Sequence, residues 1–244
     1  MKIVKENFLN YKDTYIYQDK NSFCYGIDAV LLGNFININQ SDKNIIDLGT
    51  GNIPIPLILY KRFNKKIDCV ELQDSIYELG KKTIEVNKLE NFINLYHEDI
   101  KNLPKVFKRN SYDVISINPP YFTNGKNSDK VSKTFARHEK SVNLDEILKV
   151  VNYLLTNKGH FYIINRSERF FEVIDKLKTA NLIPKRVKFV YPREDSESKL
   201  FLIDCIKAGK DSVKVESPIF LYNGNEYRKE IKEMLGDIHD TKEL

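Results

Sequence analysis

Four consecutive residues, Asn118-Pro119-Pro120-Tyr121, combine groups that could hold a weakly nucleophilic amine. Two adjacent prolines stiffen the backbone and remove two N–H donors, so their carbonyl groups stay available as acceptors. The Asn118 side-chain oxygen and the Pro119 carbonyl could bind both N–H bonds of an aryl or amide amine, with Tyr121 stacked on its ring. This positioning would free the nitrogen lone pair to attack a methyl sulfonium without a strong base. The alternative is a rigid turn that only ends a strand.

A second candidate site is the glycine-containing segment 47–54 (DLGTGNIP), which lies between an apolar run and a helical pattern. Gly49 and Gly51 allow a sharp turn and a close backbone approach to a ligand. The N–H groups of the following helix would favour a carboxylate or phosphate. Glu71 ends the next apolar run and could bind ribose hydroxyls. The predicted cofactor-binding residues of this region are Asp47, Gly49, Gly51, Asn52, Glu71, Asp99, Ile100 and Asn118.

Alternatives to a cofactor loop remain open at this point. The two glycines could serve only a tight turn. A nicotinamide dinucleotide site is disfavoured, because Pro54 and Ile55 stand near the place of the third fingerprint glycine. Asp99 could accept from an adenine amine or could simply cap its loop.

Apolar runs of strand length alternate with amphipathic segments of helix length, which predicts an α/β fold with a mostly parallel sheet and helices on both faces. The last two runs are separated only by a polar turn, so they should form an antiparallel hairpin at the sheet edge. We predict seven strands, at 44–48, 66–70, 92–96, 112–117, 159–164, 186–191 and 199–207. Predicted helices are 28–36, 53–63, 74–87, 143–155, 167–180 with Ser167 as a possible cap, and 225–235.

The alternation divides the chain into a core and two extensions. Residues 44–209 form the predicted core. Residues 1–43 form an N-terminal extension whose helix would cover the cofactor site, and residues 210–244 form a strand and helix extension packed on the core.

Composition limits the classes of protein that fit. The chain has 244 residues, of which 41% are hydrophobic and 30% charged, which suits one soluble domain. It has neither the apolar core of a signal peptide nor a run of about 18 apolar residues, so we expect a cytoplasmic protein without a membrane span. The net charge of +5 permits a polyanionic partner. The three cysteines form no cluster with histidine, so we expect no metal site.

Taken together, these motifs resemble those of class I methyltransferases that modify amino groups. Segments 25–32 (YGIDAVLL) and 136–139 (ARHE) make the chain more similar to the bacterial tRNA1(Val) adenine-37 N6-methyltransferases, over about residues 23–209. The resemblance implies a Rossmann-like class I methyltransferase fold and S-adenosylmethionine as the cofactor, with S-adenosylhomocysteine as its product. It also implies that Tyr25 and Asp28 lie over the methionine and sulfonium end. The catalytic motif is shared with DNA adenine methylases and protein glutamine methylases, which remain alternatives.

The implied substrate is an adenine in tRNA, whose phosphates should meet basic side chains. The predicted substrate-binding residues are Tyr121, Phe122, Arg137, His138, Lys140 and Arg193. Further basic candidates are Lys126, Lys130, Lys133, Lys199, Arg228, Lys229 and Lys232, although most surface lysines are merely solvated. We expect a monomer or a weak homodimer.

Overall fold

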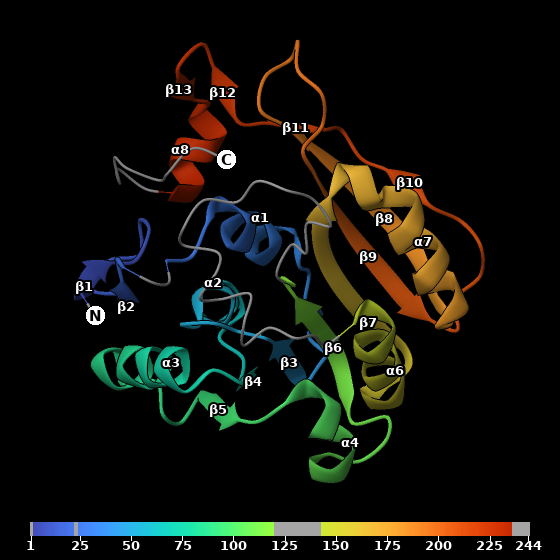
Figure 1. Cartoon of the computed structure of the whole chain (residues 1–244), viewed down its shortest axis with the longest axis horizontal. Helices are drawn as coiled ribbons and strands as arrows, with labels where there is room; N and C mark the ends of the chain where they lie inside the picture. Colours follow the sequence, from blue (N-terminus) through green and yellow to red (C-terminus); the bar gives the residue numbers. More distant parts are fainter. Residues whose placement is uncertain (1, 22–23, 120–142, 236–244) are drawn as a thin grey trace.

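A central sheet of nine strands organises the computed structural model, which describes residues 2–21, 24–119 and 143–235 (Figure 1). The strand order along the sheet is β10-β8-β9-β7-β6-β3-β4-β5, with β11 also paired to β8. The strands are β3 (Ile45–Leu48), β4 (Ile67–Glu71), β5 (Ile93–His97), β6 (Tyr112–Ile117), β7 (Leu155–Arg166), β8 (Leu182–Tyr191), β9 (Leu200–Lys207), β10 (Lys214–Val215) and β11 (Ile219–Phe220).

The predicted parallel sheet with an antiparallel hairpin is confirmed. Strands β5, β4, β3, β6 and β7 run parallel, whereas β9 is antiparallel to both β7 and β8. The predicted count of seven is exceeded because β10 and β11 pair with the outer edge of β8. Each is only two residues long, so neither produces a periodic pattern that sequence analysis could detect.

Helices cover both faces of the sheet (Figure 1). Ile45 and Ile46, neighbours on β3, point into two different apolar clusters, as alternation along a strand requires. Residues of α1 (Ile27–Phe35), α2 (Pro54–Phe63) and α3 (Asp74–Asn87) contribute to the first cluster. Residues of α4 (Leu103–Val106), α6 (Leu144–Leu154) and α7 (Phe170–Thr179) contribute to the second. A capping box of Asn143 and Glu146 begins α6.

Two predicted helices begin later than expected. The helix predicted from Ser167 is a 3₁₀ turn, η2 (Ser167–Arg169), followed by α7. Ser167 does not cap it, because its hydroxyl lies 2.7 Å from the hydroxyl of Ser198. The helix predicted over 225–235 starts only at α8 (Lys229–Leu235). Before it, β12 (Tyr222–Asn223) and β13 (Glu226–Tyr227) form a hairpin whose tip contains Gly224 at φ 62°.

The N-terminal extension contains a hairpin that the sequence analysis missed. Strands β1 (Ile3–Asn7) and β2 (Tyr15–Asp19) pair antiparallel, ahead of the predicted helix α1. In the described ranges, no helix has both the length and the apolar character that crossing a bilayer demands.

Candidate active site

The two predicted motifs leave the sheet side by side. Leu48 is paired with Ile117 on β6 and with Val70 on β4. The residues that follow these parallel strands therefore lie together at the carboxyl end of the strands (Figure 1). Asn118 therefore follows β6 next to the start of the glycine loop, and Glu71 ends β4 on the loop's other side. The structure thus brings the predicted cofactor loop and the predicted catalytic corner together.

Glu71 closes the glycine loop. Its Oε2 accepts a hydrogen bond from the backbone N–H of Gly51 at 3.0 Å, and its Oε1 accepts from the N–H of Gln73 at 2.8 Å. Burial raises the pKa of this carboxyl, while the backbone donors oppose that change. Each carboxylate oxygen keeps further acceptor capacity, so ribose hydroxyls can still be bound here. Glu71 therefore shapes the loop in addition to the ligand contact that we predicted.

The loop needs its glycines for conformation. Gly49 and Gly51 have φ values of 61° and 62°, in the left-handed region that other residues rarely adopt. Among the residues that the structure describes, no atom lies within 4 Å of a Cβ built at Gly49. The described residues therefore leave space beside the backbone of Gly49, as close approach of a ligand requires.

Three buried oxygens in the same segment have no hydrogen-bond partner within the described residues: Asp47 Oδ2, Thr50 Oγ1 and Asn52 Oδ1. Buried polar atoms are normally paired, so their clustering over six residues indicates a ligand that carries donors. The ammonium and hydroxyl groups of S-adenosylmethionine are donors of this kind. The complete burial of Asp47 raises the pKa of its carboxyl to about 7, opposed by the hydroxyls of Ser116 and Thr50. The Thr50 hydroxyl is therefore near Asp47, although the two groups do not meet the distance and angle criteria of a hydrogen bond. These residues therefore fit the cofactor that the resemblance implies.

The structure favours the capping role for Asp99. Its Oδ1 accepts from the backbone N–H of Lys101 at 2.9 Å, at the start of the 3₁₀ turn η1 (Ile100–Asn102). Ile100 is partly buried against the second apolar cluster. A direct contact of either residue with a cofactor stays a prediction.

Tyr25 and Asp28 lie at the start of α1. The backbone N–H of Tyr25 donates to Gln18 Oε1 at 3.1 Å, and its ring packs edge-on against Phe8. Asp28 lies in the first turn of α1, where its Oδ1 accepts from the N–H of Ala29 at 2.9 Å, and Gly26 is the N-cap. Their predicted contact with the methionine end stays a prediction.

Only half of the predicted catalytic motif can be placed. Pro119 is buried and Asn118 half-buried directly after β6. The other predicted catalytic and RNA-binding residues of this region lie outside the described residues: Pro120, Tyr121, Phe122, Lys126, Lys130, Lys133, Arg137, His138 and Lys140.

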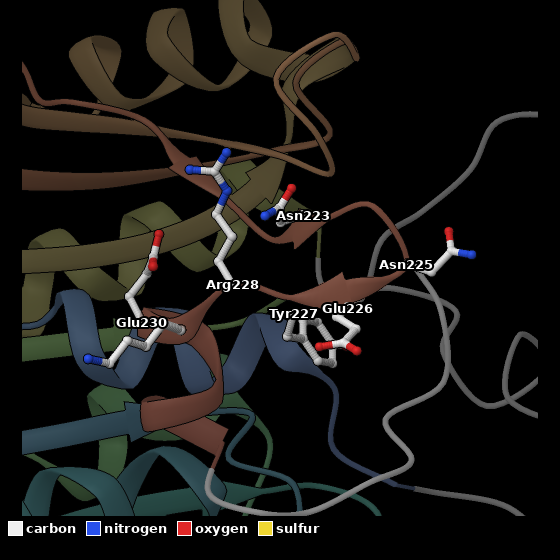
Figure 2. A pocket seen from close by; sticks show the side chains of 7 residues that line it. Asn223, Asn225, Glu226, Tyr227, Arg228 and Glu230 are labelled. Carbon is white, nitrogen blue, oxygen red and sulfur yellow. The ribbon is translucent and has the colours of Figure 1, made fainter.

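Four of the remaining basic candidates, Arg193, Arg228, Lys229 and Lys232, lie on or beside the β12–β13 hairpin, whereas Lys199 pairs through its backbone N–H with Val190 on β8. Arg193 is exposed on the turn between β8 and β9, and its Nε donates to the carbonyl of Gly224 at 2.9 Å. Figure 2 shows a pocket beside this hairpin, and its lining residues are Asn223, Asn225, Glu226, Tyr227, Arg228, Lys229 and Glu230. Arg228 forms an ion pair with Glu194, and Lys232 forms one with Glu226 at 2.6 Å. These ion pairs partly neutralise the basic face that we predicted at the C-terminus.

Two polar residues of the site, Ser116 and Thr50, were not among the predicted site residues. Ser116 donates from its hydroxyl to Asp47 Oδ1 at 2.6 Å and so connects the strands that precede the two motifs. A serine inside the apolar run 112–117 was the available signal. Across the described ranges, no group of three or more histidine, cysteine, aspartate or glutamate side chains is arranged to hold a metal ion.

Residues 16–190 match the family model described as the methyltransferase small domain. The chain belongs to this methyltransferase family. The methyltransferase is 35% identical over 153 residues to a tRNA1(Val) (adenine(37)-N6)-methyltransferase of Aliivibrio salmonicida, an alignment covering 61% of this chain and 64% of that protein, just under two thirds of its length. It is 24% identical over 231 residues to a protein of the same name from Christiangramia forsetii, which covers 94% of this chain and 96% of the relative.

Solved structures support the class I methyltransferase fold. A predicted O-methyltransferase from Agrobacterium tumefaciens superposes with a TM-score of 0.67 at 15% identity, covering 85% of this chain and 94% of that one. A geranyl diphosphate C-methyltransferase from Streptomyces coelicolor, solved with S-adenosyl-L-homocysteine, superposes with a TM-score of 0.58 at 12% identity, covering 74% of this chain and 80% of its own. At these identities the likeness concerns the fold alone.

Proposed function

We propose that this methyltransferase uses S-adenosylmethionine to methylate the exocyclic N6 amine of an adenine in tRNA, at position 37 beside the anticodon of a valine tRNA. The observation that carries the proposal is the register of the sheet, which puts Asn118 next to the glycine loop that Glu71 closes. The names of the relatives supply the substrate class.

The glycine loop and the residues beside it would hold the cofactor. When bound, S-adenosylmethionine would supply a sulfonium methyl group to the amine nitrogen, with the thioether as the leaving group and a proton lost from nitrogen. The space that the described residues leave at Gly49 would allow close backbone contact, and the buried oxygens of Asp47, Thr50 and Asn52 would accept from donors of the bound molecule. Glu71 keeps Gly51 in its left-handed conformation through the hydrogen bond at 3.0 Å.

The catalytic corner would act by position and charge. The N6 amine of adenine is a weak nucleophile because its lone pair is delocalised into the ring. The side-chain oxygen of Asn118 and the carbonyl of Pro119 accept from its two N–H bonds and stabilise the positive charge that develops on nitrogen. An adenine in an anticodon loop reaches such a corner readily, because loop bases can be splayed outward.

Transfer of label from radioactive S-adenosylmethionine tests the proposal. The protein is incubated separately with unmodified tRNA, duplex DNA and a release-factor protein, and the Asn118→Ala variant is tested beside it. We expect label in tRNA only, and a loss of at least about 100-fold in the variant, as for removal of a transition-state hydrogen-bonding group. Asn94→Ala is the matched control, since Asn94 lies on β5 and its side chain bonds to Asp68. Label in DNA or protein alone would reject the tRNA assignment.

A further inference from the structure

Side chains of α3 and of the glycine loop hydrogen-bond to the backbone of β2 and so attach the β1–β2 hairpin to the rest of the molecule. They occupy N–H and C=O groups that another strand would otherwise bind. On the outer edge of β2, the N–H and C=O of Tyr15 bond to the side-chain amide of Asn87, at 2.8 and 2.7 Å. The N–H of Tyr17 donates to Thr83 Oγ1 at 3.0 Å. Asn87 and Thr83 both belong to α3, four residues apart and therefore on the same face of that helix.

The last hydrogen bond of this series comes from the cofactor loop. Asn52 Nδ2 donates to the carbonyl of Tyr17 at 2.7 Å. The side chain of Asn52 is fully buried, and its Oδ1 has no partner in the part of the chain that the structure describes. If the Asn52 amide were turned over, its Oδ1 would face the carbonyl oxygen of Tyr17, and two acceptors would repel each other. The Tyr17 carbonyl therefore determines the amide orientation and leaves Oδ1 as the atom available to a ligand.

The same hairpin fixes the start of α1. Gln18 is buried on β2, and its Oε1 accepts from the backbone N–H of Tyr25 at 3.1 Å. Its Nε2 donates to Glu6 on β1 at 2.5 Å, which determines the orientation of the Gln18 amide. The hairpin thus contacts both the glycine loop and the segment that we predict over the methionine end.

We propose that the β1–β2 hairpin is a positioning element of the cofactor site, and that its docking on α3 through Thr83 and Asn87 is thermodynamically coupled to cofactor binding through Asn52. A docked hairpin holds the Asn52 amide with Oδ1 available as an acceptor. A ligand that donates to Oδ1 favours the same amide orientation and therefore stabilises the docked hairpin. Such coupling is reciprocal, because each event must favour the other by the same factor. This inference rests on the proposed function, since it requires that the loop binds the cofactor.

Hydrogen exchange of the full-length protein tests the coupling without any substitution. The probe is S-adenosylhomocysteine, with saturation verified by calorimetry. Within the described ranges, the N–H groups of Tyr15 and Tyr17 bond to side chains of α3 alone, so they report undocking of the hairpin. We expect exchange at these two amides to slow by at least about five-fold when the ligand is bound.

A pair of matched threonine variants tests the reciprocal effect. Thr83→Val keeps the shape of the side chain but removes the acceptor for Tyr17. Thr179→Val is the control. The Thr83 hydroxyl donates to the carbonyl of Leu79, four residues earlier in α3, and the Thr179 hydroxyl donates in the same way to the carbonyl of Asp175 in α7, at an exposed position. Loss of one neutral hydrogen bond should weaken S-adenosylhomocysteine binding by about five-fold in Thr83→Val and leave Thr179→Val unchanged.

The outcomes separate this inference from the proposed function. Slower exchange at Tyr15 and Tyr17 together with weaker binding in Thr83→Val supports the coupling. If the wild-type protein binds the ligand but the two amides exchange at unchanged rates, or Thr83→Val binds as the wild type does, the coupling is refuted and the proposed function stands. A wild-type protein that does not bind the ligand overturns both.

Discussion

The hydroxyl of Ser116 donates to Asp47 Oδ1 at 2.6 Å, between the strands that lead into the catalytic corner and the glycine loop. This hydrogen bond is buried and holds the two motifs in a fixed relation. The other oxygen of Asp47 is buried without a partner in the described residues, beside a loop that would bind a charged cofactor. One oxygen of Asp47 therefore bonds β3 to β6, while the other contributes buried negative charge beside the glycine loop when the carboxyl is ionised.

Asp47 should make stability depend on pH. Burial raises the pKa of this carboxyl from 3.8 to about 7 in the folded protein, with Glu71 as a nearby like charge. The folded state therefore binds the proton more tightly, so the stabilisation is complete below about pH 4 and is lost as pH rises through about 7. The free energy of unfolding of wild type relative to Asp47→Asn should fall by at most on the order of 4 kcal/mol over that range. Urea titrations at pH 4.5 and 7.5 measure it, and a constant difference between the proteins would contradict the assignment.

Gly49 should be required for ligand binding beyond its effect on folding. Gly49→Ala forces an alanine to φ 61°, which costs about 1 kcal/mol, and puts a methyl group into the open space of the loop. Gly224→Ala is a closely matched control, because Gly224 has φ 62° at a hairpin tip and, like Gly49, no described atom within 4 Å of an added Cβ. Thermal unfolding should show similar destabilisation of both variants. Calorimetry should show a loss of S-adenosylhomocysteine affinity of about ten-fold in Gly49→Ala alone, and equal affinities would argue against a ligand at this loop.

Glu71 should shape the cofactor loop through its negative charge. In Glu71→Gln one carboxylate oxygen becomes an NH2 group facing a backbone N–H, either that of Gly51 or that of Gln73. A hydrogen bond to a charged acceptor contributes about 1.5–3 kcal/mol, so S-adenosylhomocysteine binding should weaken by about ten-fold or more. Glu90→Gln, at an exposed position after α3, should bind as the wild type does. Unchanged binding in Glu71→Gln would remove Glu71 from the site.

His160 should stabilise the protein in acid. Its Nδ1 lies 2.8 Å from Asp204 Oδ1, and this hydrogen bond raises the pKa of the histidine, aided by Asp42 and opposed by burial and by Arg186. Because the folded-state pKa is raised, the stabilisation is present below the unfolded pKa of about 6.5 and is lost as pH rises through the higher folded value. His160→Gln should therefore be less stable than wild type by about 1 kcal/mol at pH 5.5, with a smaller difference at pH 8.5. Denaturant unfolding at the two pH values checks this, and a difference that grows with pH would contradict it.

The core was predictable because its strands and helices are long and regularly patterned. The helix Asp74–Asn87 and the strand Tyr112–Ile117 have the predicted boundaries. The hairpin of β1 and β2 was not predicted, because it mixes charged and apolar residues and its strands have no Asn-Gly or Asp-Gly turn between them. The helix predicted from 225 begins at Lys229 because the residues before it pair as β13.

At the site, residue types identified the two motifs but not the partners of their side chains. Asn52 was predicted to bind the cofactor, and that contact stays a prediction, but the sequence did not indicate that its Nδ2 bonds to the carbonyl of Tyr17, 35 residues earlier in the chain. Asp99, predicted as a possible adenine contact, bonds to the backbone of Lys101. Such partners depend on tertiary contacts that spacing along the sequence does not encode.

The identity of the methylated nucleoside tests the central claim most directly. Unmodified valine tRNA is incubated with the protein and S-adenosylmethionine, and its nucleosides and nuclease fragments are analysed by mass spectrometry. We predict one N6-methyladenosine per tRNA, in the fragment that contains position 37, and its loss in Asn118→Ala. A methyl group on another atom or in another fragment, or full N6-methyladenosine formation by Asn118→Ala, would contradict the role assigned to the Asn118–Pro119 corner.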